Sequence, residues 1–196
     1  MSNILTLLKH FADNKDKQFT IKKVSETLCM NYRIAYEGIM NLEKKGLITL
    51  NKIGNSNVCA FRYSYTSTMA EVEELRKKEV FGNKDILLVS KRIAEVKSPF
   101  YSLVLFGSHA TGKSSRHSDI DLCIIADNHD INKEVNAILS VTPLDIHLQE
   151  FTPKDFLALL KSRDNNVGNE IVRNNVVLHG MEAFYELVSR VKQAEG

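Results

Sequence analysis

The sequence predicts an α/β chain of the α+β type, in which a small helical domain precedes a domain with a mixed β-sheet. Three observations predict this class. Apolar residues recur at helical spacing through the first 45 residues, and two strand-like segments joined by a turn follow them. A strand–loop–strand pattern occupies residues 102–126. The clearest alternation of apolar and polar residues lies at residues 144–151 and predicts a further strand.

Composition limits the broad class of the protein. The 196 residues leave room for one large domain or two small ones, and 43% hydrophobic with 26% charged residues is ordinary for a soluble globular protein. No run of about 18 apolar residues occurs, so we expect no transmembrane helix, and the amphipathic N-terminus is unlike a signal peptide. Cys29, Cys59 and Cys123 lack metal-binding spacing, which predicts buried free thiols and a cytoplasmic location.

Net charge is unevenly spread along the chain. Residues 1–66 contain 10 Lys and Arg against 5 Asp and Glu, a net charge of +5. Residues 67–196 contain 16 against 19, a net charge of −3. The basic first part favours a polyanionic partner, although an excess of this size is also common on solvated surfaces.

The first 65 residues predict three helices and a hairpin. Thr20 is placed to cap the second helix, and Gly46 to end the third. A run of turn-forming residues at 54–57 joins the two strands. The third helix carries apolar residues at Ile34, Ala35, Ile39 and Leu42. The expected helices are residues 3–12, 20–28 and 32–45, and the expected strands are residues 47–52 and 58–65.

This order of elements resembles a winged helix-turn-helix domain, placed here at residues 1–66. Residues 42–48, Leu-Glu-Lys-Lys-Gly-Leu-Ile, resemble the end of the recognition helix and the first wing strand. The resemblance implies double-stranded DNA as a partner, with the third helix in a major groove and the wing tip at phosphate or the minor groove. The implied DNA-binding residues are Asn31, Tyr32, Arg33, Tyr36, Lys52 and Asn55.

A second role for this domain stays open. Winged helices also serve as protein-binding and dimerisation modules, so a protein partner or a homodimer is the alternative expectation. Only Arg33 and Lys52 are basic near the expected contact surface, which is sparse for a tight DNA binder.

Residues 67–97 predict a helical linker and the first helices of the second domain, which continues over residues 98–196. Ser67 or Thr68 can cap the first of these helices. Acidic residues gather near its start and basic residues near its end, as the helix dipole favours. We expect this charged run, residues 71–78, to form a solvated face.

The strand–loop–strand segment carries the chemistry. The apolar strand at 102–106 stops at Gly107 and Ser108, and ten residues separate Ser108 from Asp119. Residues two apart in a strand share a face, so Asp119 and Asp121 project side by side. Adjacent carboxylates repel each other and favour a cation between them, and Mg²⁺ suits such oxygen ligands.

A phosphate-binding P-loop is the competing interpretation of the same loop. Residues 107–114 fit the pattern G-x-x-x-x-G-K-[ST]. A P-loop requires a helix that opens at Gly112 and Lys113. Residues 115–118 are short and polar, and a strand follows at once, so we do not favour this interpretation.

The string Phe106-Gly107-Ser108, then Asp119-Ile120-Asp121-Leu122, resembles the nucleotidyltransferase superfamily related to DNA polymerase beta, and its minimal branch in particular. The resemblance implies two Mg²⁺ ions and ATP as substrate. Asp145 matches the family's third carboxylate, and His147 alternates onto the same face, where it could tune the site, touch substrate or be structural. The implied catalytic and metal residues are Asp119, Asp121 and Asp145, and the implied nucleotide-binding residues are Gly107, Ser108, Lys113 and Arg116.

Two function classes follow from these resemblances. In the first, the protein is an enzyme that moves AMP from ATP onto a hydroxyl of a protein, such as a HEPN-type toxin in a toxin–antitoxin pair, or of a small molecule. In the second, it is a DNA-binding transcriptional regulator whose transferase domain senses nucleotide or is catalytically silent. The complete set of three carboxylates favours the first class, because their repulsion is costly without a metal.

The C-terminal part predicts mainly helices. Thr152 and Pro153 begin one helix, residues 169–177 predict a short helix, and residues 180–193 predict a longer terminal one.

Overall fold

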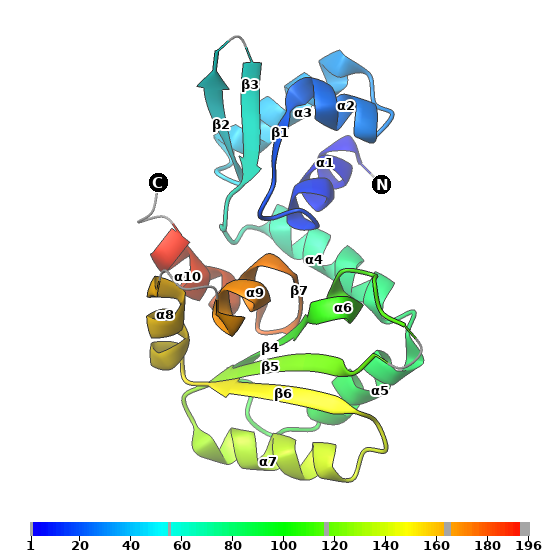
Figure 1. Ribbon diagram of the computed structural model, residues 1–196, viewed down its shortest axis with the longest axis vertical. Helices are drawn as coiled ribbons and strands as arrows, with labels where there is room; N and C mark the ends of the chain where they lie inside the picture. The colour runs from blue at the N-terminus through cyan, green and yellow to red at the C-terminus, as the bar shows by residue number, and fades with distance from the viewer. Residues whose placement is uncertain (1, 55, 116–117, 163–165, 193–196) are drawn as a thin grey trace. The chain divides into compact units, whose positions relative to one another are not determined.

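The computed structural model describes residues 2–54, 56–115, 118–162 and 166–192. The chain divides into two compact units, residues 1–72 and 73–196, and helix α4 (Ser67–Val80) begins in the first and continues in the second (Figure 1). Within the described residues, no helix is both long enough and apolar enough to span a bilayer.

The first unit combines three helices with a small antiparallel sheet, as the sequence predicted. The helices are α1 (Asn3–Ala12), α2 (Ile21–Thr27) and α3 (Tyr32–Lys44), and the strands, in spatial order, are β1 (Gln18–Thr20), β3 (Ser56–Phe61) and β2 (Ile48–Ile53). Strand β1 was not predicted, because three residues give too short a pattern and its pairing depends on the distant β3.

Capping and burial explain the boundaries in this unit. The Thr20 side chain accepts a hydrogen bond from the Lys23 amide at 3.2 Å, and Gly46 follows α3 with a φ of +69°. Of the apolar residues on α3, Ile34 points away from the core and is 42% exposed, while Ala35, Ile39 and Leu42 are fully buried. One prediction for the cysteines was wrong. Cys29 is exposed in the turn before α3, whereas Cys59 and Cys123 are buried as predicted.

A mixed four-stranded sheet lies at the centre of the second unit. Its spatial order is β6 (Ile146–Phe151), β5 (Ile120–Ala126), β4 (Tyr101–Phe106) and β7 (Asn175–His179). Strand β4 pairs antiparallel with β5 and β7, and β5 pairs parallel with β6. The mixed sheet predicted from the sequence is therefore confirmed.

Helices cover both faces of this sheet. One face packs against α5 (Lys84–Ile93) and α7 (His129–Ser140), and the other against α8 (Pro153–Lys161), α9 (Val167–Arg173) and α10 (Met181–Lys192) (Figure 1). The single-turn helix α6 (Gly107–Ala110) follows β4. Burial on both faces explains why β4 and most of β5 are buried along their length and largely apolar.

Strand β7 replaces part of a predicted helix. We expected residues 169–177 to be helical, but α9 ends at Arg173 and the chain turns into an edge strand. Asn175 marks the change, because its side chain donates 2.7 Å hydrogen bonds to the Ile171 and Val172 carbonyls at the end of α9. Val176 and Val177 then favour extended backbone, which the pairing with β4 stabilises.

The sequence predicted that the charged run of α4 forms a solvated face, and this prediction was wrong for two of its residues. Glu73 and Arg76 are buried in the second unit and form an ion pair at 2.6 Å. Glu73 also accepts hydrogen bonds from the Tyr185 hydroxyl at 2.6 Å and the Val177 amide at 3.2 Å. Arg76 donates to the Asn175 carbonyl. The pair thus connects α4 to β7 and α10.

We predict that Arg76→Ala destabilises the second unit by about 3–5 kcal/mol, because the Glu73 carboxylate stays buried without its counter-ion. Urea denaturation followed by circular dichroism measures the change. Lys133→Ala is the matched control, since it removes an exposed ion pair to Asp130, and we expect a change within about 0.5 kcal/mol. Equal stabilities of the two variants would contradict the structural role of the buried pair.

Candidate active site

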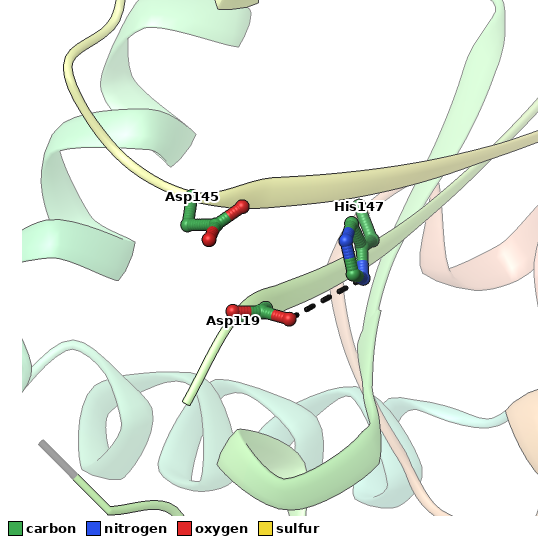
Figure 2. Close-up of side chains that lie close together, drawn as sticks. All are labelled: Asp119, Asp145 and His147. Carbon is green, nitrogen blue, oxygen red and sulfur yellow. Dashed lines mark ion pairs between the residues drawn. The ribbon is translucent and has the colours of Figure 1, made fainter. Parts of the chain in front are cut away.

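Two neighbouring strands bring the predicted carboxylates together. Asp119 directly precedes β5, and Asp145 directly precedes β6. The parallel register pairs Ile120 with Ile146 and Asp121 with His147, and the Ile120 amide donates a 2.9 Å hydrogen bond to the Asp145 carbonyl. Because side chains alternate along a strand, the carboxylates and His147 share one face while Ile120 is buried on the other. Figure 2 shows Asp119, Asp145 and His147 gathered at this edge.

The His147 ring lies close to the carboxylates of both Asp119 and Asp121. Its Nδ1 atom lies 3.6 Å from Asp119 Oδ2 and 3.7 Å from Asp121 Oδ1. Asp119, Asp145 and His147 each offer one ligand atom, and these three atoms all lie within 4.8 Å of one another. These three side chains are therefore close enough to bind one metal ion.

Electrostatics at Asp121 favour a bound cation. Burial raises the pKa of the Asp121 carboxyl above its usual range; His147 opposes this rise and the charge of Asp119 adds to it. A carboxylate that is partly desolvated beside a like charge gains more from a cation than an exposed one does.

Gly107 makes room for Asp121. Phe106, the last residue of β4, is in register with Asp121, so the next residue passes close to that side chain. A Cβ atom at Gly107 would overlap the Asp121 carboxylate, and the backbone φ of +68° also favours glycine. The family resemblance implies that Gly107 binds nucleotide; the structure shows that its backbone also lies close to a carboxylate.

The loop after Gly107 does not have the form of a P-loop. In its described residues the helix begins at Gly107, and none opens at Gly112 or Lys113. The Lys113 amide donates to the Ser108 carbonyl at 3.0 Å, and the His109 ring contacts the Ser118 carbonyl at 3.1 Å. Ser108 is half-buried next to Gly107, and Lys113 is exposed. Arg116, a predicted nucleotide-binding residue, lies outside the described residues, as does His117.

A cavity of about 540 Å³ adjoins the carboxylates, a size suited to a small molecule. Asp119 and Asp145 form one wall, Asn83 and Asp85 at the start of α5 form another, and His109 contributes from the loop. Sequence reasoning missed Asn83 and Asp85. Their local signal is that of a helix cap, since the Asn83 side chain accepts from the Asp85 amide at 2.9 Å.

Those predicted DNA-binding residues that the structure describes lie at the start of α3 and on β2. The Asn31 side chain caps α3 by accepting from the Arg33 amide at 2.9 Å, and Arg33 pairs with Glu37 at 2.8 Å. The exposed rings of Tyr32 and Tyr36 stack with centroids 6.4 Å apart. Lys52 is exposed on β2, and Asn55 lies outside the described residues.

Residues 89–171 match the family model of the nucleotidyltransferase domain. This segment is a nucleotidyltransferase domain. It contains β4, the Gly107 loop, β5 and β6, and therefore all three predicted carboxylates, so the chain carries a transferase domain. The match does not extend to the first unit.

No curated protein gives a significant match to the chain. Among solved structures, the chain is similar to one described as a crystal structure of the toxin–antitoxin with AMP-PNP. The two are 20% identical with a TM-score of 0.38, over 57% of this chain and 84% of that one.

We predict that Gly107→Ala weakens divalent-metal binding, because the new methyl group displaces the Asp121 carboxylate. Gly112→Ala is the matched control: its φ of +67° carries the same left-handed strain, about 1–2 kcal/mol, but a Cβ there meets no atom within 4 Å. Calorimetric Mn²⁺ titration and urea denaturation measure both effects. Equal metal affinities for the two variants would show that the contact with Asp121 does not matter.

Proposed function

We propose that this protein is a Mg²⁺-dependent nucleotidyltransferase that moves a nucleoside monophosphate, AMP from ATP, onto an acceptor hydroxyl. The observation that carries the proposal is the convergence of Asp119, Asp121 and Asp145 on one face of β5 and β6, within the segment that matches the nucleotidyltransferase family. This is the arrangement that the sequence motif predicts for the reaction.

The donor set at this edge fits divalent metal ions. Asp119 and Asp121 offer carboxylate oxygens side by side, and Asp145 offers more from the adjacent strand. Carboxylate oxygens are the ligands that Mg²⁺ prefers, and it takes them together with substrate phosphates. When bound, two such ions would neutralise the triphosphate and favour ionisation of the acceptor hydroxyl.

The proposed reaction is an in-line displacement at the α-phosphorus of the nucleotide. The acceptor oxygen forms a bond to that phosphorus, the bond to the oxygen that bridges the α- and β-phosphates breaks, and pyrophosphate leaves. Asp145, exposed at the edge, accepts the hydroxyl proton and passes it to water. Ser108 and nearby amides hold the phosphates, and Lys113 and Arg116 add positive charge from the loop.

The acceptor class is a further part of the proposal. The motif at residues 107–122 resembles the minimal nucleotidyltransferases, and this resemblance favours a protein hydroxyl, such as that of a HEPN-type toxin. A small-molecule hydroxyl is the alternative, and the cavity beside Asp119 has room for such a compound.

We predict that the purified chain with Mg²⁺ and α-labelled ATP transfers label to a component of a cell lysate, and that Asp119→Ala abolishes the transfer. Asp121→Ala should have the same effect, whereas Lys113→Ala should lower transfer far less. Asp127→Ala, which alters an exposed carboxylate after the other end of β5, should leave the rate unchanged. The absence of labelling with all four nucleoside triphosphates would argue strongly against a transferase.

We further propose that the first unit is a winged helix that binds double-stranded DNA. Support comes from the three helices and antiparallel hairpin, the excess of basic residues, and an exposed α3 surface with Tyr32 and Tyr36. Protein binding or dimerisation through the same surface is the alternative. Arg33, already paired with Glu37, is less available to phosphate than an unpaired arginine would be.

A gel-shift assay at physiological salt tests DNA binding. We expect the chain to bind the DNA upstream of its own gene more tightly than random DNA. Lys52→Ala should weaken binding to both DNAs and should reduce the slope of log affinity against log salt concentration by about one. Lys97→Ala, in the second unit, should change neither the affinity nor this slope. Binding to the upstream DNA that is no tighter than to random DNA would rule out a regulator that recognises this sequence.

A further inference from the structure

His147 is placed as a ligand of the proposed metal site. The register of β5 and β6 sets it opposite Asp121, and it alternates onto the face that carries Asp145. Its ring points from β6 toward Asp119 (Figure 2). The side chain is 60% exposed, so core packing does not account for its position.

The distances suit a shared ion better than direct contact. At 3.6 and 3.7 Å, His147 Nδ1 is beyond ordinary hydrogen-bonding range of both carboxylates. Ligands of one octahedral ion at about 2.1 Å lie about 3.0 Å apart when adjacent and about 4.2 Å apart when opposite. The donor atoms of Asp119, Asp145 and His147, all within 4.8 Å of one another, need only small movements to reach this spacing.

We infer that His147 is a direct ligand of the metal ion held with Asp119 and Asp145. Its ring nitrogen makes this metal position favour Mn²⁺ over Mg²⁺. Mg²⁺ is a hard ion that prefers oxygen, whereas imidazole binds first-row transition metals well. Mn²⁺ accepts the same octahedral oxygen set as Mg²⁺ and tolerates a nitrogen ligand. The inference rests on the proposed function, since it concerns the same metal site.

Electron spin resonance on the full-length, metal-stripped chain tests this inference with MnCl₂ as the probe. Electron spin-echo modulation detects a ¹⁴N nucleus bound to Mn²⁺, and the signal of free Mn²⁺ gives the affinity. We expect ¹⁴N modulation in the wild type and in His129→Gln, and its loss in His147→Gln. His129 is a suitable control because it is exposed at the start of α7, beyond the opposite end of β5.

The affinities provide a second measurement. Losing even a residue that hydrogen-bonds to a metal ligand lowers metal affinity by about 10- to 100-fold. We therefore expect His147→Gln to lower the affinity for Mn²⁺ by at least about tenfold. Mg²⁺ affinity, measured by competition, should fall much less. Two results would overturn the inference. In one, the wild type binds Mn²⁺ but shows no ¹⁴N modulation; in the other, the ¹⁴N modulation is still present in His147→Gln.

The outcomes separate this inference from the proposed function. Nitrogen-coupled Mn²⁺ in a protein that transfers no label supports the ligand assignment and argues against the transferase. Label transfer by a protein whose Mn²⁺ has no nitrogen ligand supports the transferase and overturns the assignment of His147. Failure of the wild type to bind Mn²⁺ overturns the assignment of His147, while the label-transfer assay with Mg²⁺ decides the transferase separately.

Discussion

The parallel pairing of β5 with β6 is the constraint on which the candidate site depends. Because Ile120 lies opposite Ile146, the residues just before them, Asp119 and Asp145, meet at one end of the sheet. Helix α7 makes this possible, since parallel neighbours need a crossover and α7 returns the chain from the end of β5 to the start of β6. A slip of one residue would turn Asp145 and His147 toward the opposite face.

Much of the site could be predicted because its signals are local. Asp119 and Asp121 stand out by alternation on one strand, and Asp145 by alternation on the next. The first unit was predictable for a similar reason, since its helices have apolar faces and its caps have their usual side chains. The contact between Gly107 and Asp121 was not predicted, because it is visible only when the two strands are placed side by side.

Features that depend on distant parts of the chain escaped prediction. Asn83 and Asp85 reach the cavity only because α5 packs on the sheet near β5. Glu73 and Arg76 have the spacing of an ordinary exposed pair, and only the fold shows that their partners are on β7 and α10. Strand β7 was mistaken for helix because its apolar run is short and its stabilising partner, β4, lies about seventy residues earlier.

The buried pair of α4 also decides where the sheet stops. An edge strand normally presents unpaired amides and carbonyls that invite another chain to join it. On β7 the Val177 amide and the Asn175 carbonyl are instead bonded to Glu73 and Arg76, two charged side chains of a helix. A strand from a second molecule would have to displace an ion pair from the interior to pair there. This arrangement protects β7 against edge-to-edge aggregation without a proline or a lysine on the strand.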